Sequence, residues 1–136
     1  MERSLFQFKN PTLDKLIYEE NENFSKEEYH GLKMDSSTKI KKIDEENAIV
    51  FLELIIGDKE RAPFYIDIMM KAKFTWADKM EQDVDKLLRC NAPSVLLSYI
   101  RPIVANVTSN SAYPTLNVPF INFSNNDIEG LTRVDS

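Results

Sequence analysis

Apolar and polar residues alternate over residues 64–76 of this 136-residue chain. The even positions are apolar: Phe64, Ile66, Ile68, Met70, Ala72, Phe74 and Trp76. A period of two over this length predicts a β-strand with one buried and one wet face. A β-branched and aromatic run over residues 48–56 precedes it, and the polar, glycine-containing residues 57–61 lie between them. The two runs are therefore predicted to form a hairpin.

Two more strands are predicted towards the N-terminus. Residues 31–43 place Leu32, Met34 and Ile40 on one face, and residues 44–47 turn the chain into the next strand. Residues 5–8 begin a fourth strand, which Pro11 places at a sheet edge or bends. The acidic residues 19–23 are interpreted as a solvated loop, because they lack the ligand spacing of a cation site. We expect these strands to form an antiparallel meander.

The second half of the chain changes to a helical period. Asp78 and Glu81 have the spacing of a capping box, and Met80, Val84, Leu87 and Leu88 follow at helical intervals. Residues 91–93, Asn-Ala-Pro, signal a second helix start, and Pro102 is expected to kink this longer helix without ending it. The predicted fold is α+β: a four-stranded antiparallel sheet with a short helix and a long helix packed on one face.

The predicted long helix is apolar on more than one stripe. Val95, Leu97 and Val104 lie off the stripe made by the other apolar positions of this helix. One sheet covers only one side of a helix, so we expect a symmetric partner to cover the other side. The predicted oligomer interface comprises Leu96, Leu97, Tyr99, Ile100, Arg101, Ile103, Val104 and Val107.

Composition narrows the class of protein. The net charge is −5 and the densest basic group, residues 39–42, is followed at once by acids, so nucleic-acid binding is not expected. No apolar run approaches the ~20 residues that span a bilayer, and the N-terminus does not resemble a signal peptide. We expect a single domain over residues 1–136, located in the cytoplasm, without membrane insertion.

The chain offers little for catalysis. It has one histidine, one cysteine and three glycines, which leaves no histidine-based triad spacing, phosphate loop or zinc set. Neither an enzyme nor a bound cofactor or metal is expected.

Three short motifs carry a family resemblance. They are Tyr99-x-Arg101, then Tyr113-Pro114-x-Leu116-Asn117-Val118, then Asn122-Phe123. In order and spacing this set resembles the SecB family, over roughly residues 5–123, with residues 124–136 left as a polar tail. The resemblance implies a four-stranded sheet backed by the long helix, and subunits assembled as a dimer of dimers. It also implies an ATP-independent chaperone, a holdase for unfolded polypeptides or preproteins in protein export.

A protein that binds unfolded chains needs a long apolar groove whose contacts depend little on the sequence of the bound chain. The candidate groove residues are Leu32, Met34, Trp76, Tyr113, Leu116 and Phe120. Tyr113 and Leu116 lie inside the family motif, whereas the other four follow from alternation, aromaticity and position. A core role is open for each of them.

Two features depart from the family pattern. Family members that dock to the SecA motor use an acidic outer sheet face and a further C-terminal helix. Here Lys15, Lys71 and Lys73 dilute the acids Asp67 and Glu19, and the tail is polar, so SecA docking does not follow. The alternatives are a chaperone of an antitoxin in a toxin–antitoxin module, a general holdase, or a selective oligomeric scaffold.

Overall fold

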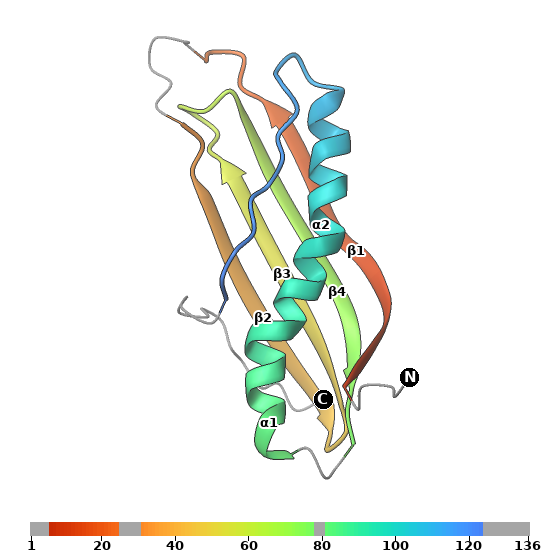
Figure 1. Ribbon diagram of the computed structural model, residues 1–136. Coiled ribbons are helices and arrows are strands. Elements are labelled where there is room, and N and C mark those ends of the chain that lie inside the picture. The colour runs from red at the N-terminus through yellow and green to blue at the C-terminus, as the bar shows by residue number, and fades with distance from the viewer. Residues whose placement is uncertain (1–5, 25–30, 78–80, 124–136) are drawn as a thin grey trace.

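A four-stranded sheet with one face covered by helix makes up the computed structural model (Figure 1). The structure describes residues 6–24, 31–77 and 81–123, with the backbone alone at residues 81–83. The strands are β1 (Gln7–Glu20), β2 (Met34–Asp44), β3 (Asn47–Gly57) and β4 (Phe64–Thr75). The helical elements are α1 (Glu81–Lys86), the π-helical turn η3 (Leu87–Asn91) and α2 (Ala92–Ser109). The predicted α+β class is confirmed.

The β3–β4 hairpin has the predicted alternation. Every second residue of both strands is buried, and Leu52 pairs with Met70 as Leu54 pairs with Ile68. Gly57 ends β3 with a φ of +76°, and a Cβ there would lie 2.1 Å from the carbonyl oxygen of Phe64. Only glycine fits this close approach of two backbones. The chain therefore leaves β3 at the position that the sequence indicated.

The position of β1 corrects the predicted meander. Strands β2, β3 and β4 follow one another as a meander, but the sheet order is β1-β4-β3-β2, so β1 lies beside β4. The prediction for Pro11 is confirmed, because β1 is an edge strand whose pairing shifts between Lys9 and Thr12. β1 extends to Glu20, so the solvated loop predicted over residues 19–23 is wrong for its first two residues.

The helical elements follow one another without a break. α2 begins where Asn91-Ala92-Pro93 predicted, with the proline in its first turn, but the expected cap is wrong: Asn91 has helical dihedral angles and its side chain caps nothing. The wider turn η3 joins α1 to α2 instead. α2 continues past Pro102, as expected. Asp78 and Met80, which predicted the short helix, lie outside the described residues. In the part of the chain that the structure describes, no helix has the length and apolarity needed to cross a membrane.

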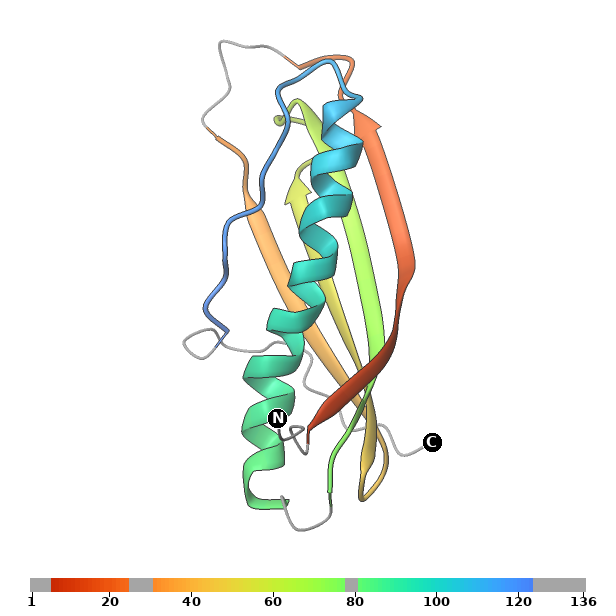
Figure 2. The ribbon, with the colours of Figure 1, turned by 45° about the vertical axis from the view of Figure 1, so that its right-hand side comes forward.

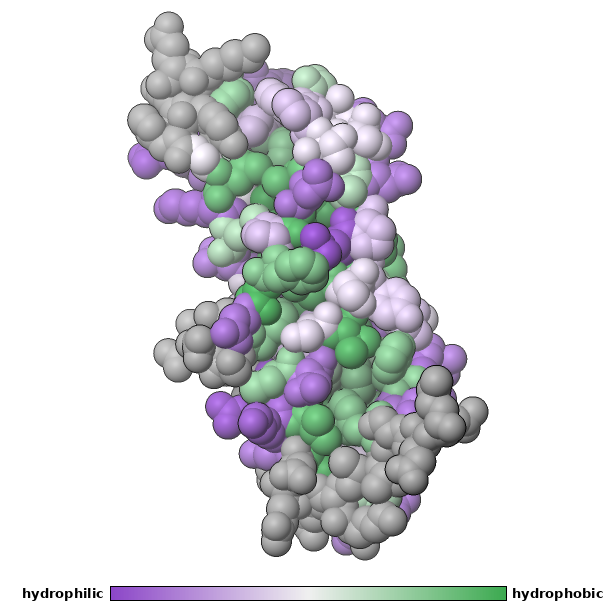
Figure 3. Space-filling model, in the orientation of Figure 1, coloured by the Kyte–Doolittle hydropathy of each residue, from purple (hydrophilic) through white to green (hydrophobic). Residues whose placement is uncertain are grey.

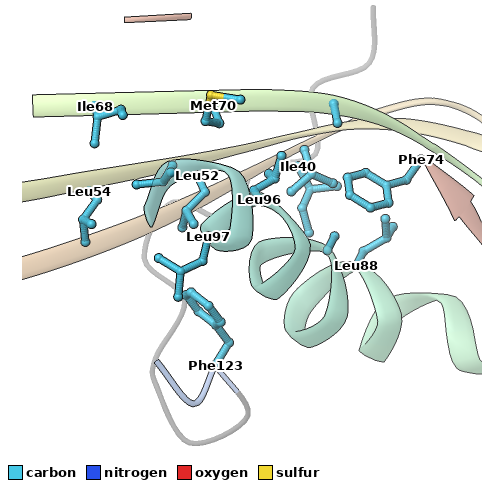
Figure 4. Packing of buried hydrophobic residues seen from close by; sticks show 14 of the residues in the cluster. Ile40, Leu52, Leu54, Ile68, Met70, Phe74, Leu88, Leu96, Leu97 and Phe123 are labelled. Atoms are coloured by element: carbon cyan, nitrogen blue, oxygen red, sulfur yellow. The ribbon is translucent and has the colours of Figure 1, made fainter. Parts of the chain in front are cut away.

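The core lies between α2 and the sheet. Leu96 points from the helix towards the strands, and Leu97 lies beside Phe123 (Figure 4). Four residues of the predicted oligomer interface are buried in this way: Leu96, Leu97, Ile100 and Val104. Because residues of the same chain already cover them, we no longer assign them to a contact between subunits. Tyr99, Arg101, Ile103 and Val107 stay at least partly exposed.

The other face of the sheet carries paired charges. The Lys15 ammonium lies 2.5 Å from a Glu53 carboxylate oxygen and 2.8 Å from one of Asp67. Hydrogen bonds to Asp67, then to Glu53, raise the pKa of Lys15. Lys71 pairs with Asp14 at 2.9 Å. The lysines therefore neutralise acids on this face, as their sequence positions indicated.

Candidate functional site

Residues 110–123, the crossing segment, follow α2 and run back along it over the sheet (Figure 2). The segment has no helix or strand between residues 114 and 122. Val118 and Phe123 are buried in the core and anchor its lower part. Because the segment is not part of the sheet, its backbone N–H and C=O groups need other hydrogen-bond partners, and side chains of α2 supply some of them. The segment thus adds a second wall beside the helix.

An apolar pocket of about 690 Å³ opens between the upper part of the crossing segment and one end of the sheet. Its lining comes from four parts of the chain: Phe24, Leu32, Pro63, Phe64, Ala112, Tyr113, Pro114, Thr115 and Leu116. None of these side chains carries a charge at neutral pH. A pocket of this size and lining suits one or two large apolar side chains.

Aromatic rings build the back of the pocket. The Tyr113 ring meets Phe24 edge-on, with centroids 6.1 Å apart, and lies 5.9 Å from Phe64. Phe64 in turn contacts Tyr18, 5.7 Å away, and burial raises the pKa of that phenol. Rings at these distances pack favourably and lose little conformational entropy on binding. The pocket therefore has an aromatic surface that is already assembled.

Hydrogen bonds fix the rim. The Asn21 side-chain amide donates to the carbonyl oxygens of Glu60, at 2.6 Å, and Ala62, at 3.2 Å, which ties the end of β1 to the β3–β4 loop. A Glu20 carboxylate oxygen accepts the backbone N–H of Ala112 at 3.2 Å. β1 and the start of the crossing segment are thus held to each other, and Glu20 leaves the rim acidic.

The structure brings together three of the six predicted groove residues. Leu32, Tyr113 and Leu116 line the pocket. Met34 is half-buried against the core and is absent from the lining, and Phe120 is 84% exposed on the crossing segment. Trp76 is only 4% exposed, because it packs at the opposite end of the sheet. The groove role predicted for Trp76 is therefore replaced by a core role.

Sequence reasoning missed much of the lining. Phe64 was assigned to the buried face of a strand, and Pro63 to nothing. Phe24 follows the acidic residues, and one aromatic residue amid polar neighbours was the available signal. Pro114 belongs to the family motif, Thr115 fills its open position and Ala112 precedes it, so the motif could have indicated the whole stretch.

A smaller hollow of about 330 Å³ lies near the other end of the crossing segment. It is lined by Cys90, Asn91, Ser94, Val95, Ile121, Asn122 and Phe123. Hydrophobic residues surface in a broken band along this side of the molecule, between polar ones (Figure 3). Apolar surface is thus offered at more than one place on the helical face.

Sequence comparisons identify relatives for most of the chain. The family profile described as preprotein translocase subunit SecB matches residues 10–126. The protein-export protein SecB of Psychrobacter arcticus is 24% identical over 115 residues, which are 83% of this chain and 78% of the relative. SecB of Psychrobacter cryohalolentis is 26% identical over 102 residues, 74% of this chain and 68% of the relative.

Solved structures show the same fold. A SecB-like chaperone from Mycobacterium tuberculosis, in complex with a ChAD peptide from the HigA1 antitoxin, superimposes with a TM-score of 0.64 at 16% identity. The match covers 86% of this chain and 91% of the other. A protein of unknown function from Streptococcus agalactiae gives a TM-score of 0.55 at 14% identity, covering 85% of this chain and 97% of that one.

Proposed function

Since this chain belongs to the SecB family of chaperones, we propose that it holds non-native polypeptides by burying their apolar side chains in the pocket beside the crossing segment. The observation that carries the proposal is the uncharged, aromatic lining of the pocket. An unfolded chain exposes aromatic and aliphatic side chains, and each one buried contributes about 1.5–3 kcal/mol before the costs of ordering. No ATP or cofactor takes part in this mechanism.

Tight binding on this mechanism needs several contacts along one client. The pocket takes side chains at one end of the crossing segment, and the exposed ring of Phe120 offers another apolar contact further along. Contacts linked through one client chain strengthen each other by effective concentration. Assembly of several subunits would multiply them, and we keep a homo-oligomer, expected as a dimer of dimers, within the proposal.

Two kinds of client are candidates. The curated relatives are protein-export proteins, which favours preproteins held in the cytoplasm before export. The mycobacterial chaperone of the same fold binds an antitoxin peptide, which favours a dedicated antitoxin client. Docking to SecA is not part of the proposal, because Lys15 already pairs with Glu53 and Asp67 on the outer sheet face.

The test is suppression of aggregation without ATP. We expect the chain, at stoichiometric amounts, to slow the aggregation of a chemically unfolded protein and to leave the folded protein unbound. Leu32→Asp places a charge in the pocket lining and should weaken this activity about fivefold or more. Ile43→Asp is the matched control, since Ile43 is exposed at the far end of β2 and should tolerate the same change.

The outcomes separate the alternatives. No effect of the native chain on aggregation would refute the holdase. Equal activity of the two Asp variants, with circular dichroism unchanged, would refute the pocket as the binding site. Capture of one folded species from lysate, in place of many unfolded ones, would favour the selective scaffold.

A further inference from the structure

The crossing segment is held by side chains where a β-strand would be held by backbone. The Leu116 backbone N–H donates to the Thr108 hydroxyl at 2.8 Å, and the Arg101 Nε–H donates to the Val118 carbonyl oxygen at 2.7 Å. Both side chains come from α2, two turns of helix apart. The two bonds fix the segment at Leu116, which lines the pocket, and two residues further along at Val118.

Thr108 is placed for this bond by burial. Its side chain is fully buried, and its hydroxyl also donates to the Val104 carbonyl oxygen at 2.8 Å. The hydroxyl proton is therefore used inside the helix, and the oxygen lone pairs are left to accept the Leu116 N–H. A buried N–H without an acceptor is costly, so the segment gains by holding Leu116 at this point.

Arg101 combines a bond with a stacking contact. It is the single charged residue of α2, and its guanidinium carbon lies 4.2 Å from the centroid of the exposed Phe120 ring. A planar guanidinium can donate in its plane and stack on a ring with its face at the same time, which an ammonium cannot do. One side chain thus orients both the backbone at Val118 and the ring two residues later.

We propose that Thr108 and Arg101 are positioning residues, which hold the crossing segment as a stationary wall so that Tyr113 and Leu116 face the pocket. This inference rests on the proposed function, since it assigns the two residues a role in client binding. They act through the wall of the pocket, and neither is among the residues that line it. A preorganised wall lowers the ordering cost that a client would otherwise meet.

Three variants test the proposal. Thr108→Val keeps the shape and removes the acceptor, Thr108→Ser keeps the acceptor, and Arg101→Met removes the donor and the charge. Arg89→Met is the matched control, since Arg89 is exposed in η3 and undergoes the same change. The measurements are hydrogen exchange of residues 112–123 in the empty protein and the Kd for reduced, carboxymethylated lactalbumin, a chain that cannot refold.

We expect Thr108→Val and Arg101→Met to speed exchange in residues 112–123 by about tenfold and to raise the Kd by about fivefold or more. Thr108→Ser and Arg89→Met should stay within about twofold of the native chain, and exchange in β3 and β4 should not change. Native values in both test variants would overturn the proposal. Faster exchange throughout β3 and β4 would also overturn it, by marking the two residues as core residues only. Failure of the native chain to bind lactalbumin would refute the proposed function, while the exchange measurement would still decide whether the wall is held.

Discussion

At the scale of single residues, burial separates side chains that look equivalent in the sequence. Trp76 and Phe120 are both aromatic, and both were predicted to line the groove. The Trp76 indole stacks near Phe6, with centroids 6.5 Å apart, and its backbone N–H donates to the Glu46 carbonyl oxygen at 3.0 Å. Phe120 contacts Arg101 and is otherwise open to solvent. Alternation gives the face of a strand, but what covers that face depends on residues far away in the chain.

Trp76→Ala should therefore destabilise the chain, by about 3–5 kcal/mol, because it leaves a large cavity in the core. Chemical denaturation measures this cost. Phe120→Ala is the control and should change the free energy of unfolding by less than about 0.5 kcal/mol. The tryptophan emission of the native chain should already be blue and should not move when a tryptophan-free client binds. A red emission that shifts on binding would contradict the core role.

Asp58, in the β3–β4 loop, should make the stability of the chain depend on pH. Its carboxylate accepts the backbone N–H groups of Arg61, at 2.5 Å, and Glu60, at 2.8 Å, and these bonds lower its pKa below the usual value near 3.8. Because the pKa of Asp58 is lower in the folded chain than in the unfolded chain, its ionised form stabilises the fold. This stabilisation is fully present above the unfolded-state pKa and is lost as the pH falls through the folded-state pKa. The difference in Tm between the native chain and Asp58→Asn should therefore be largest near neutral pH and should decrease below about pH 4. A gap that is the same at all pH values would contradict this account.

At the scale of elements, local pattern predicted the strands but left the partner of β1 open. Period-two alternation located β3 and β4, and Pro11 indicated an edge strand. An edge strand fits either side of a sheet, and the meander was the simpler choice. In the structure β1 pairs with β4, so Glu20 lies opposite Phe64.

That pairing also explains why most of the pocket lining was not predicted. It brings Phe24 to the Phe64 end of the sheet, where Tyr113 contacts both rings. In a simple meander β1 would lie about 14 Å from β4, three strand spacings away, and no such cluster would form. Leu32, Tyr113 and Leu116 could be predicted because alternation or a motif marks them. Their meeting with Phe24 and Pro63 depends on long-range pairing, which spacing along the sequence does not encode.

The charged network on the outer face of the sheet ties β1 to its neighbours. Asp67 is buried, and one of its carboxylate oxygens has no hydrogen-bond partner among the described residues. The ion pair with Lys15 therefore offsets the cost of burying the Asp67 charge. Lys15→Met should lower the free energy of unfolding by about 1–2 kcal/mol. This is less than for a fully buried ion pair, because the lysine side chain is 38% exposed. Adding Asp67→Asn should recover part of the loss, and a double-mutant cycle from urea unfolding measures the coupling. Additive effects of the two changes would show that the pair contributes nothing.

At the scale of the whole molecule, one long strip of the surface formed by the described residues is apolar and exposed. Phe8, Leu13 and Leu16 of β1 lie exposed beside α2, and Tyr99 of the helix is 40% exposed with its ring 6.2 Å from Phe8. Phe8 and Leu16 pair with the buried Phe74 and Ile68, so they share the face that α2 covers. The sheet is wider than the helix above it. We therefore expect this apolar strip to contact another chain.

Substitutions on α2 can test the expected oligomer and distinguish interface residues from core residues. Ile103→Glu changes a half-buried residue on the outer side of α2, whereas Ile100→Glu changes a fully buried one. We expect light scattering to give the native chain the mass of a dimer or tetramer, and Ile103→Glu a lower mass with native circular dichroism, because a charge is costly in an apolar interface. Ile100→Glu should unfold the chain, since its own sheet covers that position. Lys39→Glu, on the exposed outer face of β2, should leave the mass unchanged. A native chain that is monomeric at micromolar concentration would refute the assembly, and the apolar strip would then need clients, not subunits, to cover it.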